Sequence, residues 1–248
     1  MNLKSFLKRL IWGYEVLEKI DSPINGEITV VKDLFGHREM IVGGVCQSGG
    51  LVEKVWEVGI GAIRNTPACK RLAMSGRQYA KRNILILGLG GGNAAKLVSR
   101  GWPEAKIVGV EIDPKVVEVG ERYFQLDQIP NLRVIVGDAV EAISNLQLAI
   151  RDGKFNLIVV DLYLGQEFPK EAENRDFLEG LKKILSTNGL VIFNRLYYSK
   201  RQKELANNFL EKIKEFFPTV TTKKAVTNLL IFASNFASKG YNIHKVKR

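Results

Sequence analysis

The chain has 248 residues, of which 46% are hydrophobic, and a net charge of +11. This length allows one large domain with a small appendage, and the lack of any apolar run of about twenty residues predicts no transmembrane segment. Cys46 and Cys69 show neither metal-ligand spacing nor a disulfide framework, and the first residues lack a signal-peptide pattern, so we expect a cytoplasmic protein without a metal site. The lysines are scattered and do not alternate with aromatic residues, so nucleic acid is not an expected partner.

The first predicted element is an amphipathic helix over residues 3–20. Its apolar residues recur at the i, i+3, i+4 and i+7 spacing of one helix face: Leu3, Phe6, Leu7, Leu10, Ile11, Tyr14, Leu17 and Ile20. Such a stripe usually packs against the rest of the domain or against a sister subunit, and we expect a homodimer. Binding of this helix to a membrane surface is the alternative.

Residues 23–80 are expected to form a β-hairpin module and a linking helix. Residues 27–32 and 38–42 have the composition of two strands, and residues 33–37 form the turn between them. The glycine-rich segment 43–50 is expected to be a link, and a helix is expected from Leu51 to about Ile63.

The central motif of the chain lies in residues 84–113, where an apolar strand leads into a glycine loop, a helix and a second strand. The loop contains four glycines, of which Gly88, Gly90 and Gly92 stand in alternate positions. Glycine lets the backbone turn sharply and approach a ligand closely. The second strand ends at Glu111, about twenty residues after the loop, where an acid can accept hydrogen bonds from both ribose hydroxyls. This order is typical of the opening of a doubly wound α/β domain.

The spacing of these glycines departs from the dinucleotide fingerprint. Asn93 stands three residues after Gly90, where the pattern Gly-x-Gly-x-x-Gly requires a glycine. The spacing therefore weakens the case for a nicotinamide dinucleotide without excluding it. A plain tight turn in a parallel sheet is the other alternative.

Strands and helices continue to alternate after Glu111. Asp113 and Pro114 predict the N-cap and the first position of a helix to about residue 124. Further strands are expected at 132–136, 155–160 and 190–196, helices at 139–150, 177–185 and 203–217, and a closing hairpin at 219–226 and 228–233. The pattern indicates an α/β class I methyltransferase-like (Rossmann-like) fold with a seven-stranded sheet over residues 81–238, followed by a basic tail at 239–248.

Three acids stand at or just after the ends of successive predicted strands: Glu111, Asp138 and Asp161. In an open α/β sheet the ligand lies across the carboxyl ends of the strands. We therefore expect Glu111 at a ribose, Asp138 at an adenine amino group and Asp161 at the reacting centre. Each could instead be a helix N-cap or a loop acid. The three together, in register with a glycine loop, favour a nucleoside site.

These motifs resemble those of one known family. Residues 44–48 are similar to its Asp-Gly-x-x-Gln segment, Glu57 to the acid of its Tyr-His-Glu segment, and residues 88–92 to its Gly-Gly-Gly-Asp-Gly loop. Three strand-end matches follow: Glu111-Ile112-Asp113, Val136-Gly137-Asp138-Ala139 and Val159-Val160-Asp161. The family is the spermidine synthase superfamily, which contains the polyamine aminopropyltransferases and their methyltransferase-like relatives, and the resemblance covers most of residues 25–235. It implies a cofactor of the S-adenosylmethionine type held by Gln47, Gly88, Gly90, Gly92, Glu111, Asp138, Ala139 and Asp161.

The departures from the family pattern fall in its polyamine site. The glycine-loop aspartate, which in aminopropyltransferases holds the amine of decarboxylated S-adenosylmethionine and repels a carboxylate, falls at Gly91. The second acid of the Asp-x-x-Asp loop falls at Leu164, and the Tyr-His pair falls at Val55 and Trp56. Burying a diamine without an acidic partner costs several kcal/mol. The resemblance thus implies a cofactor site retained in outline and a polyamine site largely lost.

The sequence therefore predicts an S-adenosylmethionine-dependent group transferase that acts on a small-molecule acceptor, with methyl transfer favoured. Asp161 is the candidate for orienting or deprotonating the acceptor. Candidates for the wall of the acceptor pocket are Gln47, Trp56, Tyr163 and Tyr197. Two alternatives stay open, namely aminopropyl transfer from decarboxylated S-adenosylmethionine to a diamine and a non-catalytic adenosyl-binding scaffold.

Overall fold

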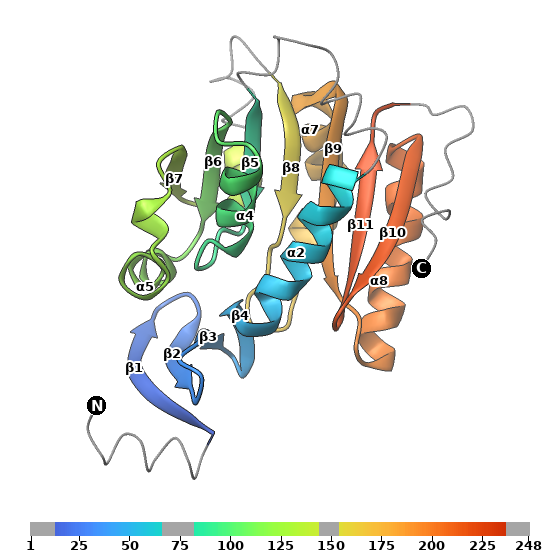
Figure 1. The fold of residues 1–248 in the computed structure, drawn as a ribbon. Coiled ribbons are helices and arrows are strands. Elements are labelled where there is room, and N and C mark those ends of the chain that lie inside the picture. Colours follow the sequence, from blue (N-terminus) through green and yellow to red (C-terminus); the bar gives the residue numbers. More distant parts are fainter. Residues whose placement is uncertain (1–12, 66–81, 144–153, 237–248) are drawn as a thin grey trace.

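The computed structural model describes residues 13–65, 82–143 and 154–236, which form two β-sheets with flanking helices (Figure 1). A four-stranded antiparallel sheet comes first in the chain, in the order β1-β2-β3-β4. Its strands are β1 (Tyr14–Ser22), β2 (Gly26–Asp33), β3 (Arg38–Val42) and β4 (Val45–Gly49). The predicted hairpin of β2 and β3 is confirmed.

Two expectations for this region are wrong. Residues 14–20 belong to strand β1 rather than to a helix, and residues 3–12 of the predicted helix lie outside the described residues. The segment 43–50 is not a simple link, because Gly43 and Gly44 form a two-residue turn that pairs β3 with β4. Both glycines have positive φ angles, 56° and 76°, as a type I′ hairpin turn requires.

The second sheet has seven strands in the order β10-β11-β9-β8-β5-β6-β7. The five strands from β9 to β7 in this order run parallel. Strand β11 is antiparallel to both of its neighbours, β9 and β10, so β10 runs in the same direction as the five. This confirms the expected fold. The strands are β5 (Asn83–Leu87), β6 (Lys106–Glu111), β7 (Leu132–Val136), β8 (Phe155–Val160), β9 (Leu185–Leu196), β10 (Thr219–Ala225) and β11 (Asn228–Ser234).

Helices cover both faces of this sheet (Figure 1). One core layer lies under α2 (Gly50–Asn65) and α4 (Asn93–Gly101), and the other under α7 (Arg175–Ile184) and α8 (Lys200–Phe216). Residues 84–87 of β5 are at most 1% exposed, because a central parallel strand is buried on both faces. None of the described helices is long and apolar enough to cross a membrane.

Two details of the larger sheet differ from the expectation or lie beyond the description. The strand predicted at 190–196 is longer than expected, because β9 starts at Leu185. A helical turn begins at residue 139 as predicted, and residues 144–150 of the predicted helix lie outside the described residues.

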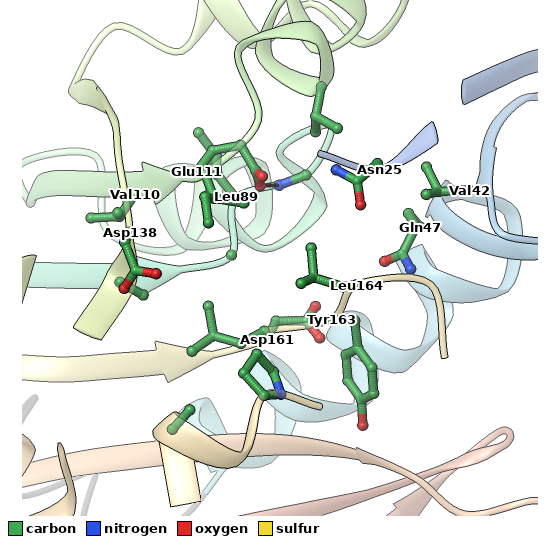
Figure 2. A pocket seen from close by; sticks show the side chains of 18 of the residues that line it. Asn25, Val42, Gln47, Leu89, Val110, Glu111, Asp138, Asp161, Tyr163 and Leu164 are labelled. Atoms are coloured by element: carbon green, nitrogen blue, oxygen red, sulfur yellow. Dashed lines mark hydrogen bonds between the residues drawn. The ribbon is translucent and has the colours of Figure 1, made fainter. Parts of the chain in front are cut away.

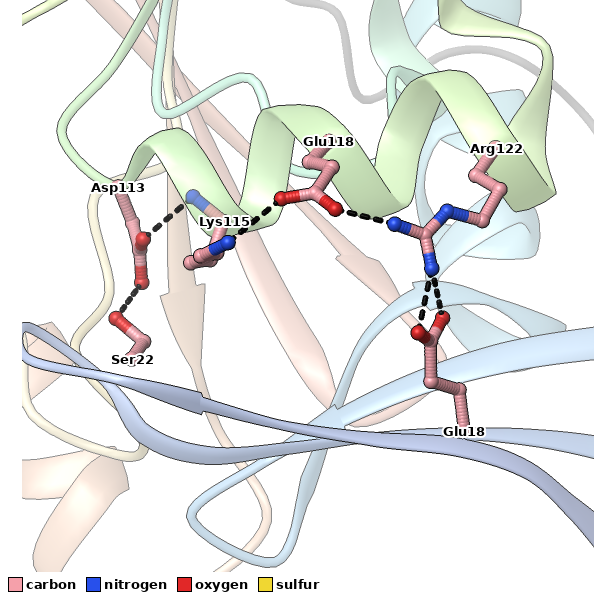
Figure 3. A network of polar contacts seen from close by, with 6 residues as sticks. All are labelled: Glu18, Ser22, Asp113, Lys115, Glu118 and Arg122. Carbon is pink, nitrogen blue, oxygen red and sulfur yellow. Dashed lines mark hydrogen bonds and ion pairs between the residues drawn. The ribbon is translucent and has the colours of Figure 1, made fainter.

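The small sheet packs on α5 (Pro114–Phe124) through apolar residues of β2 and β3, and polar contacts fix the junction. Asp113 caps α5 by accepting from the Lys115 backbone N–H at 2.8 Å. Its other carboxylate oxygen accepts from the Ser22 hydroxyl and from the Asn25 amide. At the far end of α5, Arg122 pairs with Glu18 of β1 (Figure 3). These contacts place the small sheet beside the carboxyl end of β6.

Candidate functional site

A cavity of about 380 Å³ lies at the carboxyl ends of β5, β6, β7 and β8. The chain leaves β5 toward β6 on one side and reaches β8 on the other, so this is the topological switch point at which open α/β sheets bind ligands. Strand β4 and helix α2 close the cavity with Gln47, Ser48, Val52 and Trp56. Gln47 is labelled in Figure 2. The cavity therefore lies between the two sheets.

Most residues predicted for the site line this cavity, namely Gln47, Trp56, Gly88, Gly90, Glu111, Asp138, Ala139, Asp161 and Tyr163. Among the described residues, two predicted members are absent from the lining. Gly92 ends the glycine loop, and its N–H donates to the Leu89 carbonyl. The Tyr197 ring packs against the core under α8 and its hydroxyl lies 3.3 Å from Asn207 Oδ1, so the prediction of Tyr197 as a pocket wall is wrong.

Glu111 is 8% exposed, and backbone donors hold both oxygens of its carboxylate. Oε2 accepts from the Gly90 N–H at 2.9 Å, and Oε1 accepts from the Asp113 N–H at 3.2 Å. Burial raises the pKa of Glu111, while the hydrogen bonds from Gly90 and Asp113 oppose this rise. The acid therefore braces the glycine loop and still faces the cavity.

Strand β4 contacts the other side of the glycine loop. The Gly91 N–H donates to the Ser48 hydroxyl at 2.6 Å, and that hydroxyl donates to the Gln47 carbonyl at 2.7 Å. A Cβ atom at Gly91 would lie 2.8 Å from Ser48 Oγ and 2.9 Å from Ser48 Cβ. Position 91 thus has no room for a side chain while Ser48 keeps this rotamer.

Asp138 has a structural role as well as a place in the lining. Its Oδ1 atom accepts from the Val140 N–H at 2.6 Å and from the Glu141 N–H at 3.3 Å, so it caps the helical turn that begins at residue 139. The N-cap alternative for this acid is therefore correct. Capping leaves the second carboxylate oxygen beside the cavity (Figure 2).

Asp161, just after β8, accepts a side-chain hydrogen bond on each oxygen. Trp56 Nε1 of α2 donates to Oδ2 at 3.0 Å, and Asn194 Nδ2 of β9 donates to Oδ1 at 2.8 Å. Burial raises the pKa of Asp161 to about 6, and the two donors oppose that rise. A carboxylate with this pKa can accept a proton near neutral pH.

Tyr163 presents its ring to the cavity but not its hydroxyl, which points away (Figure 2). The hydroxyl accepts from the Leu196 N–H at 2.7 Å and lies 3.3 Å from the Asn194 carbonyl. Burial raises the pKa of this phenol. Tyr163 is therefore an apolar wall rather than an acid or base.

Several residues of the site were not found from the sequence. Ser48, Asn25 and Glu171 line the cavity, and Asn194 contacts Asp161 from outside the lining. Asn194 interrupts an apolar run in β9, and a buried amide in such a run is the signal that could have found it. Leu164, at the position of the family's second acid, lines the cavity and is 42% exposed, whereas Val55 is in the core.

The cavity is acidic although the chain is basic. Its described lining contains five carboxylates and neither lysine nor arginine, and the acids are Glu111, Asp138, Glu141, Asp161 and Glu171. The described residues as a whole carry equal numbers of basic and acidic side chains. The excess positive charge therefore lies in residues 1–12, 66–81 and 237–248.

The chain is similar to curated proteins of two kinds. It is 31% identical over 149 residues to a polyamine aminopropyltransferase of Vibrio vulnificus, an alignment that covers 59% of this chain and 49% of the relative. It is 29% identical over 165 residues to an eEF1A lysine and N-terminal methyltransferase homolog of Drosophila melanogaster, covering 64% of this chain and 24% of the relative. The matched region spans half or less of each of these relatives.

Solved structures agree on the fold. A human methyltransferase-like protein 13 in complex with SAH has a TM-score of 0.62 at 24% identity and covers 79% of this chain and 86% of its own. A spermidine synthase from Thermotoga maritima has a TM-score of 0.68 at 14% identity and covers 90% of this chain and 74% of its own. The spermine/spermidine synthase domain matches residues 65–243. The chain belongs to the spermine/spermidine synthase domain family.

Proposed function

We propose that this protein is an S-adenosylmethionine-dependent group transferase, with methyl transfer favoured. The observation that carries the proposal is that Glu111, Asp138 and Asp161 meet the glycine loop in one cavity at the switch point of the sheet. In this arrangement Glu111 accepts from the ribose hydroxyls, Asp138 accepts from the adenine amino group and Gln47 completes the wall. The relatives named as methyltransferases and aminopropyltransferases support the same class of reaction.

The glycine loop does not exclude an intact methionine carboxylate. Because Ser48 fills the space beside Gly91, no acid can stand at that position to repel a carboxylate. S-adenosylmethionine supplies a methyl carbon that its sulfonium already activates. The protein then has to align the acceptor, exclude water and hold a proton, and Asp161 is placed for the last task.

The charge of the cavity supports one class of acceptor. The described part of the lining has five carboxylates and neither lysine nor arginine. This charge favours a cation or a neutral amine over an anion as the acceptor. Leu164 forms an apolar, partly exposed part of the same wall. A small-molecule amine whose nitrogen reaches Asp161 is therefore the proposed acceptor.

The cofactor can be tested by thermal unfolding. S-adenosylmethionine or its demethylated product, at a hundredfold excess over the dissociation constant, should stabilise the protein by about 2.7 kcal/mol through mass action. NAD serves as the control nucleotide and should leave the melting temperature unchanged. Stronger stabilisation by decarboxylated S-adenosylmethionine than by the intact form would contradict methyl transfer.

Aminopropyl transfer to a diamine is the second candidate, and Glu171 is the observation that favours it. This acid lines the cavity and could take the place of the family acid that is absent at Leu164. Against it, Trp56 stands where the family has a polar pair and uses one oxygen of Asp161. A non-catalytic adenosyl-binding scaffold is the third reading, and cofactor binding without turnover of any amine would support it.

An assay of aminopropyl transfer to putrescine separates the two enzymatic readings. We expect no turnover by the wild type, because Leu164 supplies no counter-charge for the distal ammonium. Leu164→Asp should increase putrescine affinity in a titration, since it restores that charge. Robust wild-type turnover that disappears in Asp161→Asn would show that the polyamine reading is the correct one.

The remaining expectations stay predictions. A homodimer could form through β1, which is an edge strand with exposed Tyr14 and Val16 side chains. Light scattering would test the oligomeric state. The cytoplasmic location and the lack of a nucleic-acid partner rest on the sequence alone. The proposed membrane contact through residues 3–20 is weakened, because residues 14–20 are part of a strand.

A further inference from the structure

The two groups that hold Asp161 both donate to it, but only one of them is restricted to donating. The indole Nε1–H of Trp56 has no acceptor capacity, so the Asp161 Oδ2 atom must accept from it. The Asn194 side chain has both a donor and an acceptor, and its orientation therefore depends on its other neighbour. That neighbour is Asn228, the first residue of β11.

A chain of amides leads from the β10–β11 turn to Asp161. Asn228 Nδ2 donates to Asn194 Oδ1 at 2.8 Å, and the Thr227 hydroxyl donates to Asn228 Oδ1 at 2.9 Å. Asn194 and Asn228 are only 4% and 7% exposed, so little water reaches them to replace these bonds. Since Oδ1 of each amide is already an acceptor, the NH₂ group of Asn228 donates to Asn194 and the NH₂ group of Asn194 donates to Asp161.

We propose that Asn228 and Asn194 are positioning residues that, together with Trp56, hold Asp161 as an ionised hydrogen-bond acceptor at the cavity. If the Asn194 amide were reversed, its Oδ1 would face Asp161 Oδ1, and the two oxygens would repel each other unless the acid were protonated. In the orientation described, Asn228 opposes that reversal, because its NH₂ group would then face the NH₂ group of Asn194. The role of this carboxylate in group transfer rests on the proposed function, whereas the effect of the amides on Asp161 does not.

The direction of the expected effect follows from the two opposing influences on this acid. Burial raises the pKa of Asp161, and the hydrogen bonds from Asn194 and Trp56 lower it. Removing the amide chain leaves the burial in place and removes a donor, so the pKa must rise further. Protonation of Asp161 at a higher pH would weaken it as a base.

Other charged groups near Asp161 are few and come from three directions. Its cavity neighbours with titratable side chains are Glu111, Asp138, Glu141, Glu171 and Tyr163. Beside Asn194 on β9, Arg195 stacks between the rings of Phe168 and Phe209 and pairs with Glu173 at 2.7 Å. On α2, Glu53, Lys54 and Glu57 are exposed, whereas Trp56 faces inward.

Trp56 itself can report the titration of Asp161 without any substrate. The chain has three tryptophans, so a Trp12→Phe, Trp102→Phe background of the full chain leaves Trp56 as the single indole. Its emission should change as Asp161 ionises, with a midpoint at about pH 6. Asp161→Asn in the same background should abolish the transition and so assign it.

Asn228→Leu keeps the number and branching of the side-chain heavy atoms but removes their hydrogen bonds, and we expect it to raise the midpoint by about one pH unit. Asn194→Leu should do the same. Asn207→Leu, the same exchange on the exposed face of α8, is the matched control and should leave the midpoint in place. Circular dichroism checks the fold of each variant. If a buried variant does not fold, Thr227→Val, at the exposed end of the hydrogen-bonded amides, should give a smaller rise in the midpoint.

An unchanged midpoint in a folded Asn228→Leu protein, with the Asp161→Asn assignment intact, would overturn the proposal. So would a transition that persists in Asp161→Asn. Failure of S-adenosylmethionine to bind would overturn the proposed function but not the amide chain, because the titration uses the protein without cofactor. The two failures are therefore distinguishable.

Discussion

Replacing Gly88 by alanine is expected to destabilise the protein by about 3 kcal/mol or more and to prevent cofactor binding. A Cβ atom at this position would lie 2.1 Å from the Asp161 carbonyl oxygen, which belongs to backbone and cannot rotate away. The φ angle of Gly88 is also +82°, which alanine rarely adopts. The ends of β5 and β8 would have to separate, breaking the bond of 2.8 Å from the Asp161 N–H to the Leu87 carbonyl.

Urea denaturation measures this loss, and Gly137→Ala provides the matched control. Gly137 also lines the cavity, but an added Cβ there would meet nothing within 4 Å. We expect the control to unfold within about 0.5 kcal/mol of the wild type and to keep its cofactor affinity. Similar midpoints for the two variants would show that the β5–β8 junction relaxes far more than this geometry implies.

Glu111→Gln is expected to lower S-adenosylmethionine affinity at least tenfold while the protein stays folded. Hydrogen bonds to a charged acceptor contribute about 1.5–3 kcal/mol each, and glutamine presents one oxygen where the carboxylate presents two. One of the two backbone donors, Gly90 or Asp113, would face an amide NH₂ group. Calorimetric titration measures the affinity, and unchanged binding would mean that the ribose lies elsewhere. Glu141→Gln, another acid of the lining, is the control.

The same variant gives a pH dependence of stability with a defined sign. Burial raises the pKa of Glu111 in the folded protein above its ordinary value. A raised pKa means that the group stabilises the fold at low pH and that this contribution is lost as pH rises through the folded-state pKa. Relative to Glu111→Gln, which does not titrate, the wild type without cofactor should therefore lose stability as pH rises through this range. An opposite trend would mean that the backbone donors outweigh burial.

The sequence predicted the large sheet well because its strands carry strong local signals. The apolar run 84–87 ends in glycine, and Asp113 followed by Pro114 marks the start of α5, so each element is determined by its own residues. The helix prediction for residues 14–20 was wrong because a β-bulge gives apolar residues a spacing similar to that of a helix. The irregularity between Val16 and Glu18 lets Leu17 and Ile20, three residues apart, both pack toward α5.

Site residues whose role follows from their type and their place in the sequence could be predicted. Residues whose role depends on a contact with another part of the fold were missed. Glu111 could be placed because strand-end acids face the ligand side of an open sheet. The direction of the Tyr163 hydroxyl, away from the cavity, could not be predicted, because it depends on backbone groups of β9. The Asn194–Asn228 contact joins two strands that pair only after the chain has folded.

The docking of the small sheet has a thermodynamic consequence. Asp113 is fully buried, binds Ser22 and Asn25 of the small sheet, and donates its own N–H to Glu111. Ser48 in β4 binds the glycine loop directly. Docking of the sheet and binding of a ligand at Glu111 are therefore linked equilibria, and linkage is reciprocal. A bound nucleoside would stabilise the docked sheet and so slow hydrogen exchange in β4. Detachment of the sheet would weaken nucleoside binding by the same coupling free energy.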